Sequence, residues 1–140
     1  MSILFAIYSE WALTALRVFV GALFMVHGWP KLKDIRGTAA WMGEAGFRPG
    51  MLFAPLVAAL EFFGGMALLL GIFTRPVAAL LALQFLVILV WRLATRHPFT
   101  AMDRAGWELD LVLLGATLVL MTAGGGALQL GAWLSLFLLR

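Results

Sequence analysis

Long apolar runs alternate with short polar segments along the whole chain. The first run, at about residues 11–28, is interrupted only by Arg17, and further runs follow at about 51–70, 76–93 and 107–123. A helix needs about 20 predominantly apolar residues to cross the hydrocarbon core of a bilayer. The pattern therefore predicts an all-α integral membrane four-helix bundle, formed by a single transmembrane domain.

The ends of these runs carry side chains that prefer the membrane interface. Trp29 and Pro30 follow the first run. Since Trp favours the headgroup level and Pro stops a helix, we expect the first helix to end at about residue 28. In the polar loop that comes next, residues 39–44 are predicted to form a short interfacial helix.

The last hydrophobic segment is short. Three glycines at 124–126 separate the fourth run from a tail helix predicted at about 127–139. This tail helix would be about 20 Å long at about 1.5 Å per residue, which is short for a crossing. We interpret it as an interfacial or partly re-entrant helix, with a fifth crossing as the alternative.

Composition excludes a water-soluble domain, and the distribution of charge predicts an orientation. The chain is 64% apolar and 12% charged, whereas soluble domains are about 25% charged. Seven Lys and Arg residues lie in the loops 28–50 and 92–106, against Arg75 and Arg140 on the opposite side. The positive-inside rule then places both loops in the cytoplasm and both termini on the outer side of the membrane. Topology thus explains the net charge of +3, and we expect the lipid bilayer, not nucleic acid, as a partner.

The absence of cysteine removes several chemistries at once. Disulfides, thiolate nucleophiles and iron–sulfur ligation all need cysteine. His27 and His97 both fall near the predicted cytoplasmic boundary, but no ligand spacing typical of a metal site surrounds them. We therefore expect no metal and no haem, and no cofactor motif is evident in the chain; a quinone stays open.

Arg17 and Glu61 are charged residues inside predicted spans. Counted from the outer ends of their helices, Arg17 lies about 9 Å deep and Glu61 about 14 Å deep. Each charge alone would cost about 2.5–3.5 kcal/mol on insertion scales, so such residues usually face the bundle interior and pair. We therefore predict a buried Arg17–Glu61 ion pair as the polar centre of the bundle. Gly21 and Gly28 on one helix, and Gly64 and Gly65 on the other, would permit the close approach.

Two interpretations of this pair stay open. In the first, the pair is structural and fixes the register of the helices. In the second, it forms the polar part of a quinone, proton or small-ligand site, because ionisable residues within a membrane often mark such sites. Gln84 in the third span is a further candidate for the site, although a hydrogen bond between helices is the favoured interpretation of this residue.

Glu108 and Asp110 open the fourth span near the predicted cytoplasmic interface. Residues two apart lie about 200° apart around a helix, so both carboxylates cannot point into the bundle. We expect one of them to face inward toward His27, Lys31 or Arg92. The other would face the headgroups or the helix N-terminus, where the helix dipole favours a carboxylate. A structural pairing is favoured over ligand binding.

Over about residues 17–130 the order of these features resembles the DoxX family of small bacterial and archaeal membrane proteins. The resemblance rests on the first-span pattern from Arg17 to Gly28, on Glu61-Phe62-Phe63-Gly64-Gly65, on Gly106-Trp107-Glu108-Leu109-Asp110, and on the glycines 124–126. It implies a four-helix membrane fold and a place in a bacterial inner membrane. Family members are often named as oxidoreductase or quinone-linked subunits, and that naming rests on association with redox partners.

Three functions compete at this point. The chain is a quinone-contacting or non-catalytic subunit of a membrane oxidoreductase assembly that docks a redox protein, a small proton-coupled transporter, or a purely structural assembly factor. Because no redox cofactor motif is present, it is at most an oxidoreductase subunit without a cofactor site of its own. A homo-oligomer is plausible, since four helices bury little surface.

Overall fold

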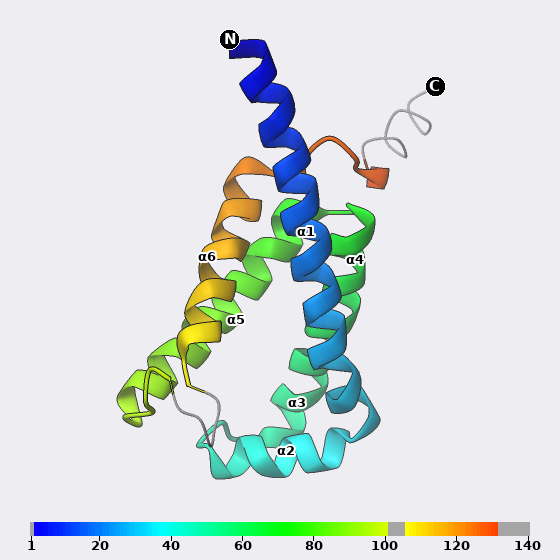
Figure 1. The fold of residues 1–140 in the computed structure, drawn as a ribbon. Coiled ribbons are helices and arrows are strands. Elements are labelled where there is room, and N and C mark those ends of the chain that lie inside the picture. Colours follow the sequence, from blue (N-terminus) through cyan, green and yellow to red (C-terminus); the bar gives the residue numbers. More distant parts are fainter. Residues whose placement is uncertain (1, 101–105, 132–140) are drawn as a thin grey trace.

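The computed structural model describes the backbone of residues 2–100 and 106–131 and, from residue 7 onward, their side chains (Figure 1). These residues form helices and connecting turns, with no strand among them, which confirms the all-α prediction. The elements are α1 (Ser2–Lys33), α2 (Ile35–Glu44), α3 (Gly50–Ala59), the π-helical turn η1 (Leu60–Gly64), α4 (Gly65–Leu70), α5 (Thr74–Ala94) and α6 (Glu108–Ala123).

Three stretches of helix are long and apolar enough to cross a membrane. They are Ile7–Lys33 of α1, the continuous stretch Gly50–Leu70 made of α3, η1 and α4, and Thr74–Ala94 of α5. These stretches correspond to the first three predicted spans. The fourth predicted span corresponds to α6, whose 16 residues give about 24 Å of helix. A crossing by α6 stays a prediction.

The first helix does not end before Pro30, so the predicted end at about residue 28 is wrong. Helix α1 continues through Pro30 to Lys33, and the carbonyl of Pro30 accepts a bond from the amide of Asp34 at 3.1 Å. Proline removes its own donor but keeps its carbonyl, so the helix can run on past it. Asp34 then caps α2 by accepting from the amide of Gly37 at 2.8 Å, and α2 is longer than the predicted 39–44.

Glycines bring α1 into backbone contact with the second stretch. A Cβ atom at Gly21 would lie 2.7 Å from the carbonyl oxygen of Gly65, and a Cβ atom at Gly28 would lie 2.5 Å from the amide nitrogen of Phe62. Small residues allow helix backbones to approach this closely in a membrane. The two stretches are therefore antiparallel and in a fixed register, with Gly28 level with η1 and Gly21 level with α4.

The other half of the bundle is the pair of α5 and α6, which pack along each other. Phe24 of α1 joins the two halves through an edge-on ring contact with Phe85 of α5 at 5.3 Å, and Leu68, Leu81 and Leu120 are buried around it. Figure 1 shows that α5 and α6 lean away from α1 and α3 toward the end of the bundle where α2 crosses. The halves thus meet near α4 and diverge near α2.

Helix α2 bridges this wider end. The indole nitrogen of Trp91 in α5 donates to the carbonyl of Ala45, just after α2, at 2.8 Å. The Trp91 ring also lies 6.1 Å from that of Trp41 and 5.9 Å from that of Phe47. This aromatic cluster ties the α5–α6 half to the segment that follows α1.

After α6 the chain turns at Gly124 and Gly126, which both have positive φ angles, and returns to α1. The amide of Ala127 donates to the carbonyl of Glu10 at 3.3 Å. Residues 127–129 are not helical, so a tail helix that begins at about residue 127 is wrong; Leu130 and Gly131 are helical, and the rest of the predicted tail lies outside the described residues. Close contact with α1 explains the difference, because the amides of Ala127 and Leu128 donate to Glu10 and Thr14 of α1.

Candidate functional site in a cavity between the helices

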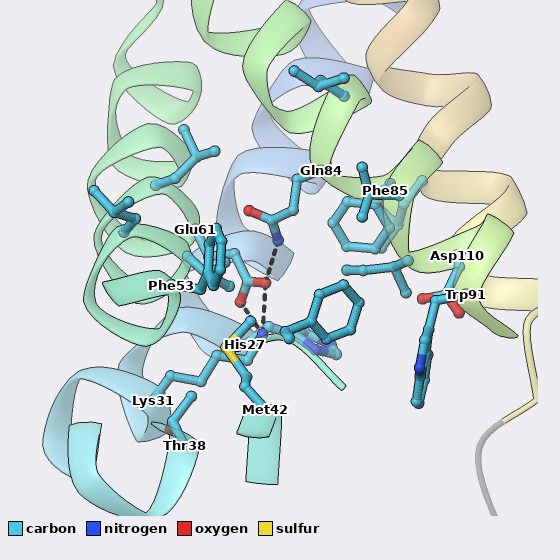
Figure 2. Close-up of a pocket in the computed structure, with 18 of the residues that line it drawn as sticks. His27, Lys31, Thr38, Met42, Phe53, Glu61, Gln84, Phe85, Trp91 and Asp110 are labelled. Atoms are coloured by element: carbon cyan, nitrogen blue, oxygen red, sulfur yellow. Dashed lines mark hydrogen bonds and ion pairs between the residues drawn. The ribbon is translucent and has the colours of Figure 1, made fainter. Parts of the chain in front are cut away.

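Glu61 is the most buried acid of the described chain, at 1% exposure, and it is held by two side chains from other helices. The ammonium of Lys31 in α1 lies 2.5 Å from each carboxylate oxygen. The amide nitrogen of Gln84 in α5 donates to Oε1 at 2.6 Å. Figure 2 shows the three side chains pointing toward one another from three separate elements. The result is a small charged cluster inside an apolar bundle.

Local backbone features place Glu61 in this position. Glu61 belongs to η1, where one turn of wider π-helix interrupts the second stretch, and such single turns often occur at functional sites. Gly28 lets α1 lie directly against this turn. Helix α1 continues past Pro30, and this places Lys31 close enough for its flexible side chain to reach the Glu61 carboxylate.

A cavity of about 610 Å³ opens beside this cluster, and we call it the interhelical cavity. Its walls are mainly apolar and come from α1, α2, α3, η1, α5 and α6, with aromatic rings among them (Figure 2). The apolar and aromatic lining includes Trp41, Phe47, Phe53, Leu56, Leu80, Leu83, Phe85, Val87 and Trp91. Its charged and polar lining is Glu61, Lys31, Gln84, His27, Arg92 and Asp110, with Thr38.

A second ion pair lines the same cavity. Asp110 in the first turn of α6 lies 2.6 Å from the guanidinium of Arg92 in the last turn of α5. Asp110 is the buried member of the predicted pair of acids and Arg92 is one of its three expected partners, so the expectation of one inward acid is confirmed. Glu108 does not line the cavity. Its Oε2 atom lies close to the backbone of Gly106 at the start of α6.

The predicted Arg17–Glu61 ion pair is wrong. Arg17 is 2% exposed, and its guanidinium donates to the carbonyl of Leu68 at 3.1 Å and to that of Leu128 at 2.5 Å. A Cβ atom at Gly71 would overlap the same guanidinium, so Arg17 lies level with the end of α4. Glu61 lies ten residues earlier in that stretch, which is about 15 Å along a helix.

The first and second helices do not end in the same plane, so the depths of Arg17 and Glu61 cannot be compared by counting from the helix ends. Helix α1 begins at Ser2 and extends well beyond the end of α4. With Gly28 at the level of Glu61, the cation nearest to that acid is Lys31. The sequence pattern predicts Lys31 as a partner of Glu108 or Asp110, and the structure pairs it with Glu61 instead.

The two histidines occupy different positions. His27 is exposed and lines the interhelical cavity. The Nδ1 atom of His97 lies 2.8 Å from the hydroxyl of Thr95, and its ring lies 5.0 Å from that of Trp91. Within residues 2–100 and 106–131, no group of three or more His, Asp and Glu side chains is arranged to hold a metal ion.

Sequence reasoning missed Phe47 and Trp91 as cavity residues, and the role of Arg92 there. Trp41, in the interfacial helix predicted at 39–44, lines the cavity together with them. A signal was present, because Trp91 directly precedes Arg92 at the end of the third span and Phe47 lies in the same polar loop as Trp41. Only the bridging position of α2 brings these two regions together.

These features define the class: a small helical membrane protein with a ligand-sized cavity that carries buried charge. The sequence pattern of the DoxX family matches residues 12–94, more than half of the chain. The chain belongs to the DoxX family. The matched range contains Lys31, Glu61, Gln84 and Arg92, whereas Asp110 lies beyond it.

Similar proteins are found in two bacteria. The Bacillus subtilis (strain 168) protein named "Putative oxidoreductase CatD" is 33% identical over 115 residues, which cover 82% of this chain and 81% of the relative. The Escherichia coli (strain K12) inner membrane proteins YphA and YqjF are 30% and 32% identical, and the matches cover 81% and 79% of this chain and 84% and 82% of the relatives. No solved structure matches the chain.

Proposed function

We propose that this chain is a quinone-binding subunit of an oxidoreductase assembly in the bacterial inner membrane, with the interhelical cavity as the binding site. The observation that carries the proposal is the Glu61 carboxylate, held by Lys31 and Gln84 at the wall of an apolar cavity. A separate redox protein would exchange electrons with the bound quinone, because the chain has no cysteine and no cofactor motif of its own.

The size and lining of the cavity fit a quinone ring. Small-molecule sites are usually hollows of about 300–1,000 Å³ with mainly apolar walls and a few well-placed polar groups. The interhelical cavity has about 610 Å³ and is lined by aromatic rings such as Phe85 and Trp91. Aromatic rings pack well in offset or edge-on arrangements, which suits a flat ring between apolar walls.

The polar end of the cavity offers both donors and acceptors. Lys31 has three N–H donors, and Glu61 is an acceptor when ionised. The Oε1 atom of Gln84 is buried and has no hydrogen-bond partner among the described residues. A ring carbonyl could thus accept from Lys31, and a ring hydroxyl could donate to Gln84 or Glu61. A bound quinone would supply the redox chemistry, while these side chains position its ring.

The proposed orientation places this polar end toward the cytoplasm. Lys33, Arg36, Arg48 and Arg96 are exposed at the α2 end of the bundle. An excess of Lys and Arg favours the cytoplasmic side. This surface would also be where a soluble redox protein docks. The relatives YphA and YqjF are named inner membrane proteins, which supports the same membrane for this chain.

The proposal is tested by extracting quinone from the protein purified out of native membranes in mild detergent. We expect quinone in near-stoichiometric amount. Glu61→Gln should lower the affinity for quinone about tenfold or more, and with it the amount recovered, because a hydrogen bond to a charged group contributes about 1.5–3 kcal/mol and 1.4 kcal/mol is a factor of ten in affinity.

Glu44→Gln is the matched control, since Glu44 is exposed on α2 and does not line the cavity. It should retain the quinone of the unaltered protein. Unchanged helical circular dichroism in both variants separates loss of binding from loss of fold. Protein that carries no quinone and shows no saturable binding of added quinone would refute the proposal.

A further inference from the structure

The interhelical cavity reaches the lipid-facing surface between α3 and α5. Leu56 of α3 and Leu83 of α5 both line the cavity, and they are 60% and 59% exposed. A side chain that lines a cavity and is also exposed stands at its mouth. Phe53, Leu80 and Val87 share both properties, so the mouth runs along both helices.

The packing of the bundle explains why the mouth lies there. Helix α5 packs against the second stretch at η1 and α4, whereas α3 packs against α2 and α1. The two helices therefore separate on the α2 side of η1, as Figure 1 shows. Both belong to stretches long and apolar enough to span a membrane, so the medium outside the mouth is the hydrocarbon of the bilayer.

Polarity changes sharply from the inside of the cavity to this mouth. The charged groups Lys31, Glu61, Arg92 and Asp110 lie on the inner walls. Between α3 and α5 the rim consists of Phe53, Leu56, Leu80, Leu83 and Val87, none of which can make a side-chain hydrogen bond. The other exposed lining residues, His27, Trp41 and Leu109, lie on α1, α2 and α6. An occupant that fits both parts has a polar head inside and a purely hydrocarbon part that passes the rim.

We infer that the ligand is a long-tailed, membrane-dissolved quinone that enters sideways from the bilayer, with its ring at Glu61 and its hydrocarbon tail between α3 and α5. This inference rests on the proposed function for the identity of the ring. It adds the substrate class, because a small water-soluble quinone has no tail for the rim. The alternative entry route for the quinone is the α2 end of the bundle, which is bridged by the cluster of Trp41, Phe47 and Trp91.

The position of the tail is tested with a benzoquinone that carries a photoreactive diazirine on a ten-carbon tail. The protein is reconstituted in lipid nanodiscs, illuminated and mapped by mass spectrometry. Labelling that an excess of the unlabelled probe abolishes should fall on Phe53, Leu56, Leu80, Leu83 and Val87. A diazirine fatty acid labels the whole lipid-facing surface and shows the background.

The route is tested by narrowing the mouth. Leu83→Trp and Leu56→Trp should slow association of the ten-carbon probe about tenfold, since a steric barrier to entry acts on the association rate. The matched controls are Leu86→Trp on α5 and Leu52→Trp on α3, which are exposed to a similar degree but do not line the cavity. They should leave the rate unchanged.

The outcomes separate the two proposals. Saturable binding with competed labels only on α2, or with equal rates in all four Trp variants, would overturn lateral entry and leave quinone binding intact. A complete lack of saturable binding, both of the ten-carbon probe and of a benzoquinone with a single isoprene unit, would overturn both.

Discussion

Helix α1 carries a basic side chain toward each end of the bundle, and the two are neutralised in different ways. Lys31 forms an ion pair with the carboxylate of Glu61. Arg17 binds two backbone carbonyls, those of Leu68 and Leu128. Leu68 lies in the last turn of α4, where its carbonyl also accepts from the amide of Gly71 at 3.0 Å and where the helix dipole is negative. A guanidinium, with five N–H donors in a fixed fork, suits this role better than an ammonium.

The surroundings of the two cations differ as well. Around Arg17 the chain is tightly packed, because a Cβ atom added at Gly71 would overlap its guanidinium and one added at Gly125 would lie 3.1 Å from its Cδ atom. Beside Lys31 and Glu61 lies the interhelical cavity. Burial of charge within the membrane therefore does not by itself indicate a ligand site. The Arg17 cluster fastens the C-terminal segment to α1 and α4, whereas the Glu61 cluster faces a space that a ligand can fill.

Removal of Lys31 should have the largest effect on stability. Lys31→Met leaves the buried Glu61 carboxylate without its cation, and breaking a buried pair in this way costs about 3–5 kcal/mol. Glu61→Gln in the same chain should restore more than half of the loss, since no charge then remains unpaired. The measurement is the free energy of unfolding in mixed detergent micelles, for both single variants and the double variant.

Lys33→Met serves as the control. Lys33 is exposed one half-turn further along α1, with its ammonium 4.9 Å from the Trp29 ring, and its loss should change stability by about 0.5 kcal/mol or less. If the effects of Lys31→Met and Glu61→Gln simply add in the double variant, the ion pair contributes nothing, and the contrast with Arg17 disappears.

Replacement of Arg17 should have the second largest effect and a different signature. Arg17→Met removes the guanidinium from the Leu68 and Leu128 carbonyls, of which Leu68 keeps the amide of Gly71 as a donor. We expect a cost of about 1.5–3 kcal/mol, the range for one hydrogen bond to a charged group. The variant also removes the free-energy cost of holding a charge at this depth in the membrane, and this gain offsets the loss of the second hydrogen bond. Hydrogen exchange at residues 124–131 should accelerate, while quinone binding at the other end stays unchanged.

Arg36→Met provides the comparison variant, since Arg36 is exposed on α2 at the opposite end of the bundle. It should affect neither stability nor exchange at the C-terminal segment. Loss of quinone from Arg17→Met without loss of fold would show that the two clusters are energetically coupled, so that the Arg17 cluster would not have a purely structural role.

The hydrophobic pattern was sufficient to predict the helices and several of the polar residues. The three long spans, the short helix before residue 44 and the inward acid at the start of α6 are all present. Each depends on residues close in sequence: apolar runs, a capping Asp34, and the periodicity that separates Glu108 from Asp110 by about 200°.

The partner of Glu61 could not be predicted in the same way, because it depends on the register between two helices. That register is set by backbone contacts at Gly21 and Gly28, and it places Arg17 about 15 Å from Glu61 along the helix. The cavity was also beyond sequence reasoning. It arises where α5 diverges from α3 and α2 bridges the opening, which depends on contacts between residues far apart in sequence.

The smallest of the three effects tests whether this register positions the Glu61 cluster. In Gly28→Ala the added methyl group meets the backbone of Glu61 and Phe62, and in Gly21→Ala it meets that of Gly65 and Leu69. Overpacking costs about 1–3 kcal/mol, and for one methyl group we expect about 1–2 kcal/mol in both variants. Gly115→Ala is the control, since a Cβ atom there meets nothing within 4 Å and alanine favours the helix.

The two glycine variants should differ in ligand binding although they agree in stability. A methyl group at Gly28 pushes α1 away from η1, the turn that presents the Glu61 carboxylate to Lys31, so bound quinone should fall. At Gly21 the displaced neighbour is α4, which contributes no residue to the cavity wall, and bound quinone should be retained. Equal losses of quinone in both variants would mean that the whole helix pair moves as one body, and that Gly28 has no special part in placing Glu61.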